Sequence, residues 1–123
     1  MPRKTPAKSS APAPTRRSPC PVACGLDLFG DKWTLLIIRD LILGRSRFKD
    51  FIESPEGIPT NILSDRLERL RDGGIVQQIP AADGSRRLAY QLTDKGLALR
   101  PVLRAIRDWG LKWEPGTRAN LEG

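Results

Sequence analysis

The 123-residue sequence has no histidine, only two cysteines, and no aliphatic run longer than residues 35–38. Two cysteines without histidine cannot complete a four-ligand structural zinc site, and the commonest general base of enzymes is missing. No apolar segment of the kind that a signal peptide needs follows the basic N-terminus. We therefore predict a soluble, intracellular protein that is not an enzyme, has no catalytic residues, holds no metal or other cofactor, and does not engage a membrane.

Acidic residues are absent from residues 1–19, which supply five of the seven net positive charges and also contain five prolines. Such a composition offers too little apolar surface to offset the entropy of ordering, which predicts a disordered basic tail. The length that remains suits one domain over residues 20–114, followed by a C-terminal tail at 115–123. The charged tail is expected to add nonspecific, salt-sensitive affinity for nucleic acid or to aid solubility.

Glycine and proline divide the domain into predicted elements. Pro21 suits a first helical position with Cys20 as its N-cap, and Gly30 and Gly44 stop two successive helices. Thr60 is expected to cap a later helix, after a break at residues 54–57. The predicted helices cover residues 21–28, 31–43, a short segment that starts at 46 or 47, and 60–72.

The predicted helix over residues 60–72 has one apolar face. Leu63, Leu67 and Leu70 recur at helical spacing and are expected to fix that face to the core. The opposite face then points outward and is polar. It consists of Asn61, Ser64, Asp65, Glu68 and Arg69. An ordinary solvated helix face is the alternative interpretation of this pattern.

Two short apolar segments, 76–79 and 88–92, flank a basic turn at 83–87 and predict a β-hairpin. Pro80 is tolerated only at an edge or a strand end. A helix held on one side, beside a ribbon that carries Arg86 and Arg87, has the geometry with which a winged helix-turn-helix enters a major groove and grips the backbone. Binding of double-stranded DNA is therefore the leading hypothesis.

The C-terminal part predicts one long helix that opens at residues 93–96 and ends at 115–116. Pro101 lies inside it and cannot donate its backbone hydrogen bond, which predicts a bend about one turn earlier. The fold class that follows is mainly α with a small β-hairpin (α+β). The apolar face of this helix consists of Leu99, Val102, Ile106, Trp109 and Trp113.

Several motifs in a fixed order carry a resemblance to a known family. They include Cys-Pro-Val at 20–22, Gly-Asp-Lys-Trp at 30–33, Arg-Phe at 47–48, Ile-Pro followed by the leucine-spaced helix to 70, Gly-Ile-Val at 74–76, Tyr-Gln-Leu-Thr-Asp-Lys-Gly at 90–96, and Trp109 to Trp113. Residues 20–113 thereby resemble the HxlR-type winged helix-turn-helix regulators, which are close to the MarR-like repressors. The resemblance implies a bacterial, cytoplasmic, nucleoid-associated transcriptional regulator.

The resemblance also implies a homodimer whose first and last helices form the interface, and repression as the more frequent outcome. We assign this interface to Val22, Leu26, Val102, Ile106, Trp109 and Trp113. For the two tryptophans, stacking on a ligand is the alternative. Such a dimer would present two recognition helices to adjacent major grooves about 34–36 Å apart on a pseudopalindromic operator.

We expect most DNA contacts to come from the helix over 60–72 and from the hairpin. The groove contacts are assigned to Thr60, Asn61, Ser64 and Arg66, with Asp65 accepting from cytosine or orienting an arginine, and Arg69 on the backbone. The wing contacts are assigned to Ser85, Arg86 and Arg87, with ordinary loop solvation as the alternative. Candidate phosphate contacts are Arg45, Arg47 and Lys49.

Some HxlR-type regulators use the cysteine before the first helical proline to sense electrophiles, quinones, aldehydes or oxidants, and Cys20 matches that position. A thiol at a helix N-terminus also meets the positive end of the helix dipole, which favours the thiolate. Cys24 departs from the single-cysteine pattern. Residues four apart on a helix have Cβ atoms about 5–6 Å apart, against about 3.5–4.5 Å in a disulfide. Oxidation is therefore expected to join subunits or rearrange the dimer. Simple packing of both thiols is the alternative.

Two other classes of function stay open. The same fold serves as a protein-binding adaptor in some settings, because a fold alone does not dictate a nucleic-acid ligand. A thiol redox enzyme built on Cys20 and Cys24 is disfavoured by their spacing and by the lack of histidine. The operator, the effector and the sign of regulation cannot be read from the residues.

Overall fold

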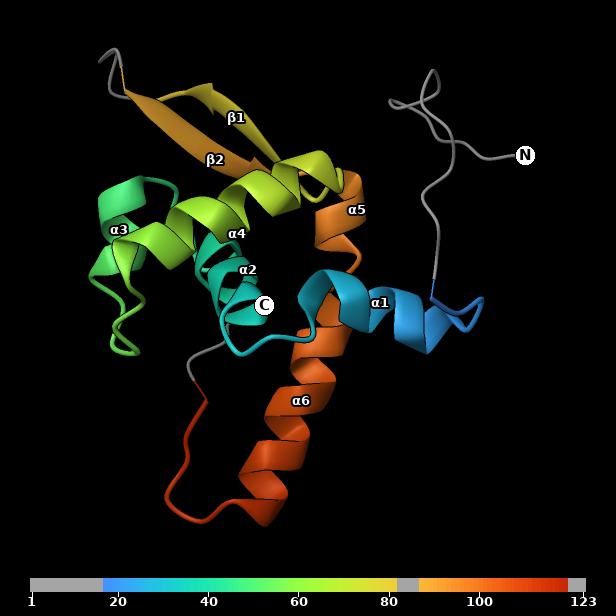
Figure 1. The fold of residues 1–123 in the computed structure, drawn as a ribbon. Coiled ribbons are helices and arrows are strands. Elements are labelled where there is room, and N and C mark those ends of the chain that lie inside the picture. The colour runs from blue at the N-terminus through green and yellow to red at the C-terminus, as the bar shows by residue number, and fades with distance from the viewer. Residues whose placement is uncertain (1–16, 82–86, 120–123) are drawn as a thin grey trace.

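A computed structural model describes residues 17–81 and 87–119 (Figure 1). Within them the chain forms six helices and one two-stranded antiparallel sheet. The elements are α1 (Pro21–Phe29), α2 (Thr34–Ile42), α3 (Phe48–Ile52), α4 (Thr60–Asp72), β1 (Val76–Pro80), β2 (Leu88–Leu92), α5 (Asp94–Leu97) and α6 (Arg100–Trp113). The mainly helical fold with a small hairpin is confirmed. The predicted tail over 1–16 and the turn residues 82–86 lie outside the described residues.

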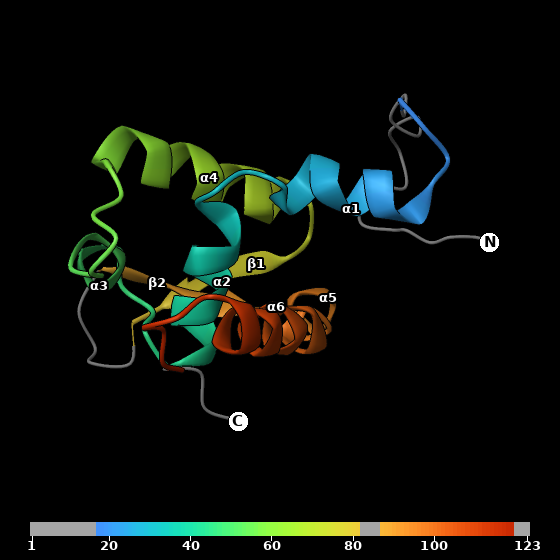
Figure 2. The ribbon, with the colours of Figure 1, turned by 90° about the horizontal axis from the view of Figure 1, so that it is seen from below.

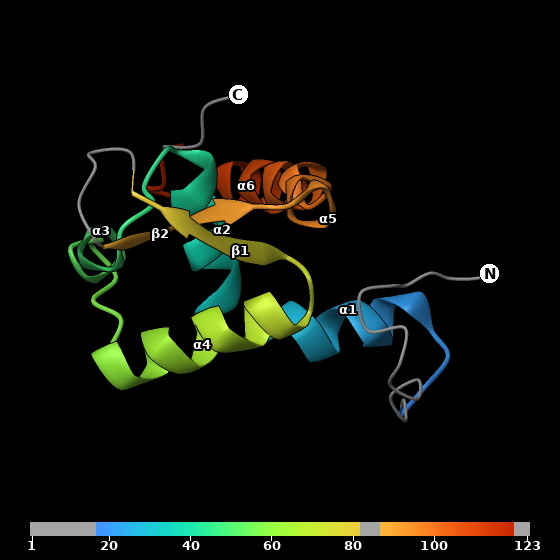
Figure 3. The same cartoon turned by 90° about the horizontal axis from the view of Figure 1, so that it is seen from above.

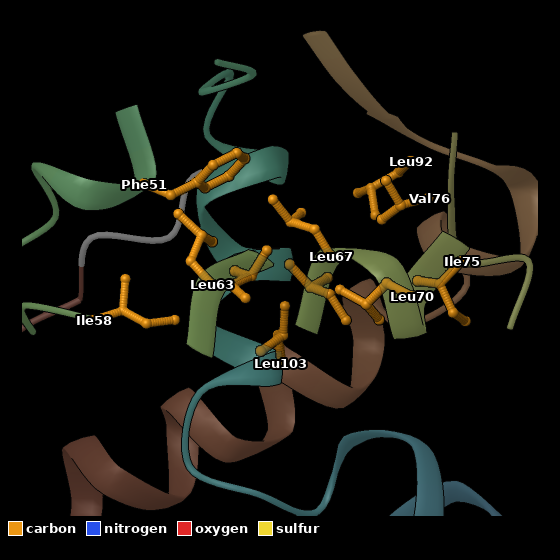
Figure 4. Close-up of a cluster of buried hydrophobic side chains, with 11 residues drawn as sticks. Phe51, Ile58, Leu63, Leu67, Leu70, Ile75, Val76, Leu92 and Leu103 are labelled. Carbon is orange, nitrogen blue, oxygen red and sulfur yellow. The ribbon is translucent and has the colours of Figure 1, made fainter. Parts of the chain in front are cut away.

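The core forms where α4 lies over α2 and the hairpin (Figure 4). Leu63, Leu67 and Leu70 are at most 2% exposed, so the predicted buried face of α4 is confirmed. They pack with residues from the other elements: Ile37, Ile38, Phe51, Ile58, Ile75, Val76, Leu92 and Leu103. Full burial of a leucine side chain contributes roughly 1.5–3 kcal/mol. One side of α4 is therefore anchored firmly, and the opposite side is left to solvent.

The starts of two helices differ from the sequence prediction. α2 begins at Thr34 rather than near Asp31, because the Asp31 carboxylate accepts hydrogen bonds from the N–H groups of Trp33 (3.0 Å) and Thr34 (3.2 Å). A short side chain that satisfies the first donors of a helix holds its own backbone outside the helix. Thr60 is the first helical residue of α4, and Pro59, not Thr60, occupies the N-cap.

Glycine ends α2 and α4 through the same hydrogen-bonding pattern. Gly44 and Gly74 have φ values of 97° and 76°, a left-handed conformation that costs little without a Cβ. The following amide then reaches back to the last turn, from Arg45 to the Asp40 carbonyl and from Ile75 to the Leu70 carbonyl, each at 2.9 Å. These bonds form Schellman motifs, and the second one directs the chain from α4 straight into β1.

The predicted single C-terminal helix is wrong in its continuity. The chain forms a short α5 and a longer α6, with a turn at residues 98–99 between them. Pro101 is the second residue of α6, where a backbone donor is not needed inside the helix. The irregularity predicted about one turn before Pro101 is thus confirmed, and it is a complete break.

The Thr-Asp-Lys-Gly run at 93–96 attaches this C-terminal part to the end of α4. The Thr93 hydroxyl lies 2.5 Å from the Gly74 carbonyl, and Lys95 Nζ donates to the Gly73 carbonyl at 2.8 Å. A Cβ on Gly96 would collide with the Ile75 carbonyl oxygen and the Leu92 side chain. The run therefore fits closely against the turn between α4 and β1.

The hairpin pairs Val76 with Leu92 at one end and Pro80 with Leu88 at the other, which confirms the strand-end position of Pro80. It is also attached to the start of the α3 region. The Tyr90 amide donates to the Ser46 carbonyl at 2.8 Å, and the rings of Phe51 and Tyr90 meet edge to face with centroids 6.3 Å apart. The position of the hairpin is thereby set relative to α3.

Candidate nucleic-acid interface

The outward face of α4 is polar and open to solvent, as predicted. Thr60, Asn61, Ser64 and Asp65 are exposed, and the side chain of Arg69 is 47% exposed. Figures 2 and 3 show α4 along one side of the molecule and α6 along the opposite side. Because leucines hold the inner face, these polar side chains can meet a partner without disturbing the core.

Arg66 is placed differently from the other predicted groove residues. Its side chain is 20% exposed, and its Nε donates to Asp31 Oδ2 at 2.9 Å. It also pairs with the neighbouring Asp65, whose carboxylate lies 3.9 Å from Arg69 Nη1. Arg66 thus points back toward the start of α2, and its groove contact stays a prediction.

A buried polar network supports the connection between α3 and α4. Asp40, 2% exposed, accepts from Arg45 Nη1 (3.0 Å), from Arg39 Nη2 (3.0 Å) and from the Ser54 hydroxyl (2.5 Å). Arg39 also donates to both carboxylate oxygens of Glu56, at 2.8 and 2.9 Å. The hydrogen bonds from Arg39 lower the pKa of Glu56 and so keep it ionised. The network fixes the loop that leads into α4.

This network was not predicted from the sequence. A carboxylate at an inward position is costly unless cations and hydroxyls pair with it. The neighbouring Arg39 and the nearby Arg45 were the available signal. Since Arg45 pairs with Asp40 and is 42% exposed on its side chain, its predicted phosphate contact has to coexist with that pairing.

Three of the predicted phosphate-binding cations lie around one open groove between α3 and the hairpin. Arg47 and Lys49 line its α3 side, and Arg87 lines its hairpin side. Asp50 orders the start of α3 by accepting from the amides of Arg47 (2.9 Å) and Ser46 (3.1 Å), and these bonds lower its pKa. The structure therefore brings together cations from two elements. Ser85 and Arg86 lie outside the described residues.

Both cysteines are free thiols, and they lie in the first turn of α1. Cys20 is exposed at the N-cap, whereas Cys24 is half-buried and its Sγ donates to the Ser18 carbonyl at 3.4 Å. The helical bond from the Cys24 amide to the Cys20 carbonyl is intact at 3.0 Å. In this helical geometry a disulfide between them would require distortion of the turn.

The helices α1 and α6 expose large apolar side chains. None of the nine residues of α1 is buried, and in α6 only Leu103 is. Most of the predicted interface residues are at least half exposed: Val22 (69%), Leu26 (50%), Ile106 (50%), Trp109 (58%) and Trp113 (59%). Val102 is half-buried. So many exposed large apolar side chains on two helices are typical of an interaction site.

The profile of the HxlR-like helix-turn-helix family matches residues 28–117. The chain belongs to this family. It is therefore a transcriptional regulator of the HxlR and MarR-like type with a winged helix-turn-helix fold, and DNA binding is the activity of that class. Within the described residues, no helix of this HxlR-like regulator is long and apolar enough to cross a membrane, and no cluster of three candidate metal ligands occurs.

Individual relatives agree with the family assignment. The uncharacterised HTH-type transcriptional regulator YvaP of Bacillus subtilis is 33% identical over 88 residues, which are 72% of this chain and 82% of YvaP. The crystal structure of PA1607, a proposed transcription factor, matches 84% of this chain and 72% of its own, with 44% identity and a TM-score of 0.75.

The transcriptional regulator YodB of Bacillus subtilis is similar both in sequence and in structure. Its reduced form matches 80% of this HxlR-like chain and 98% of its own, with 33% identity and a TM-score of 0.66. A quinone-bound form of YodB matches 76% of this chain and all of its own, with 32% identity and a TM-score of 0.64.

Proposed function

We propose that this HxlR-like regulator binds a pseudopalindromic operator as a homodimer and represses transcription. The observation that carries the proposal is the exposed polar face of α4, held from behind by Leu63, Leu67 and Leu70. Thr60, Asn61 and Ser64 offer hydroxyl and amide groups to base edges, and Arg69 offers a cation to the backbone. The cations around the groove between α3 and the hairpin grip the flanking phosphates.

The homodimer accounts for the apolar surface of α1 and α6. Ile106, Trp109 and Trp113 follow one another at helical spacing and are all half exposed or more. Tryptophan buries roughly 150–250 Å² when it is covered, so a second copy would remove a large apolar area from water. A twofold dimer would also present two copies of α4 to adjacent major grooves.

Cys20 is proposed as the sensor of an electrophile or oxidant. It is exposed at the start of α1, a helix of the proposed dimer interface, and YodB, a relative, has been crystallised with a quinone. A thiolate at this position can attack an electrophile, and the bulky adduct would then alter the packing of α1 against the second copy. Cys24, which is half-buried and hydrogen-bonded to Ser18, is the less accessible thiol.

The experiment is an unbiased selection of bound DNA from random duplexes, with and without a quinone. We expect a pseudopalindromic motif whose enrichment falls when the quinone is present. Cys20→Ser should abolish the quinone response and keep the motif, whereas Cys24→Ser, the matched control, should keep both. A response that survives in Cys20→Ser and is lost in Cys24→Ser would assign the sensor to the other thiol.

If the selection enriches no DNA motif, the protein-binding adaptor becomes the favoured function. Specific DNA binding weakens along a steep line when log affinity is plotted against log salt concentration, because bound counterions are released. An adaptor would give no enriched motif and no footprint.

A further inference from the structure

An ion pair links Asp31, which lies just before α2, to the middle of α4. Arg66 Nε lies 2.9 Å from Asp31 Oδ2, and the two side chains are 20% and 25% exposed. The same carboxylate accepts from the Trp33 and Thr34 amides and from the Thr34 hydroxyl at 2.5 Å. Asp31 therefore binds the first turn of α2 and α4 at once, although Asp31 and Arg66 are 35 positions apart.

The chemistry of Asp31 makes this link persistent. Partial burial raises the pKa of its carboxyl, but the hydrogen bonds from Thr34, Arg66 and the Trp33 amide outweigh that effect and lower the pKa to about 2. The carboxylate is thus charged at neutral pH. A charge-assisted bond between partly shielded groups is stronger than an exposed surface pair.

A second set of contacts ties the C-terminal half of α4 to α1. Arg69 Nη2 donates to the Asp27 carbonyl at 3.4 Å, and Leu28 packs so closely on Gly73 that a Cβ there would come within 2.9 Å of it. Figures 2 and 3 both show α1 beside the C-terminal end of α4. With the leucines already fixing its inner face, α4 is held laterally at its middle by Asp31 and at its end by α1.

We propose that Asp31 is a positioning residue for operator recognition, which acts through Arg66 to set the rotation of α4 about its axis. This inference rests on the proposed function, because it assumes that the outward face of α4 reads the operator. It reassigns Arg66 from a groove contact to a support. The proposal also gives the Gly-Asp-Lys-Trp segment a role in presenting Asn61 and Ser64, which lie far from this segment in the sequence.

The test is a double-mutant cycle on operator binding with Asp31→Asn, Arg66→Gln and the double variant. Asparagine keeps one side-chain oxygen that can accept from the Trp33 and Thr34 amides, so Asp31→Asn retains these acceptor contacts and removes the charge from the pair. Asp94→Asn is the matched control, since it removes the same charge from an exposed residue in the first turn of another helix, α5. Affinity is measured for the selected operator and for a random duplex, at one salt concentration, on variants shown to be folded.

We expect each single variant to lose about tenfold in operator affinity, the effect of roughly one charge-assisted contact. Random-duplex affinity should stay within about twofold, and the double variant should be no weaker than either single variant, because both remove the same link. Asp94→Asn should bind the operator within about twofold of the wild type. A residue that only stabilised the fold would leave the affinities of the folded variants unchanged.

Two results would overturn the proposal. One is operator binding by Asp31→Asn that equals or exceeds that of the wild type while Arg66→Gln binds more weakly, since Arg66 would then contact DNA directly. The other is full additivity in the double variant. If the wild type selects no operator, the proposed function fails. Amide hydrogen exchange then tests separately whether the Asp31–Arg66 pair holds α4 in place. Arg66→Gln should speed exchange in the middle of α4 and leave β1 and β2 unchanged, and equal exchange in α4 rejects the positioning role.

Discussion

Two helical surfaces of this HxlR-like regulator are equally open to solvent and opposite in chemistry. The outward face of α4 consists of hydroxyl, amide and charged groups over a row of buried leucines. The outward face of α6 carries Ile106, Trp109 and Trp113, each at least half exposed. Exposure alone therefore does not tell what a surface does. A polar face remains stable in water without a partner. Covering a row of exposed tryptophans, in contrast, removes apolar surface from water and lowers the free energy.

The helices α4 and α6 are amphipathic in different ways. In α4 the apolar row points to the core of its own chain, and the polar row is available for a ligand. In α6 only Leu103 is buried in its own chain, so most of the apolar row is left over after folding. We infer that the outward face of α4 serves DNA recognition and that the outward face of α6 serves dimer formation.

The largest expected effect comes from placing a charge on the exposed row of α6. Trp109→Glu should convert the proposed dimer to a monomer, because the carboxylate would have to be desolvated at the interface. Operator affinity should then fall by about 1,000-fold, toward nonspecific binding. Analytical ultracentrifugation and operator titration measure the two effects.

The control for this variant is Leu88→Glu, which places the same charge on an apolar side chain that is half exposed on β2. Its sedimentation should match that of the wild type. An unchanged mass for Trp109→Glu would remove α6 from the dimer interface.

The next effect contrasts the two faces of α4 itself. Leu67→Ala should lower the free energy of unfolding by about 2–5 kcal/mol, since Leu67 is 2% exposed and its removal leaves a cavity. Glu68→Ala, one residue further and exposed, should change it by less than about 0.5 kcal/mol. Urea denaturation measures both. Similar losses for the two variants would contradict the assignment of the faces.

A smaller effect is expected for a single backbone contact. Arg69→Ala should weaken operator binding about tenfold and reduce the slope of log affinity against log salt by about one, because one fewer phosphate is neutralised. Arg118→Ala removes an equal charge from an exposed position after α6 and should leave the slope unchanged. Equal changes for both variants would indicate only a general effect of net charge.

The smallest effect concerns acid stability. The pKa of Asp31 is about 2 in the folded chain, below the value of about 3.9 for an unperturbed aspartate, so the unfolded state binds a proton more readily. The stability that Asp31 contributes is therefore complete above about pH 4 and is lost as the pH falls toward 2. Asp31→Asn should flatten the dependence of unfolding free energy on pH in this window. Parallel curves for the two proteins would show that the carboxylate is not held as described.

Local sequence patterns were enough to predict much of the fold. The spacing of Leu63, Leu67 and Leu70 was enough to identify the buried face of α4, because helical geometry brings such residues to one side. Gly44 marked a helix end through its backbone freedom, and Pro101 marked an interruption through its missing donor. In each case the physical cause acts within a few residues, so the sequence alone contains it.

The features that the sequence did not predict depend on contacts between residues that are far apart in the chain. Asp31 looked like the start of a helix and instead lies before α2 and accepts from the Trp33 and Thr34 amides, and its pairing with Arg66 spans 35 positions. Asp40 was not singled out in the sequence and is the centre of a network with Arg39, Arg45 and Ser54. Which cation meets a buried carboxylate depends on how distant segments pack, and no local spacing encodes that distance.

The sequence by itself determined most elements of this protein, the polar and apolar faces of α4, and the likeness to HxlR-type regulators, because periodicity, caps and turns act over short range. Only the tertiary structure decided that Arg66 turns toward Asp31, that cations of α3 and the hairpin share one groove, and that the apolar row of α6 stays uncovered. Those outcomes depend on which surfaces remain after the core has closed, and the packing of the whole chain sets them.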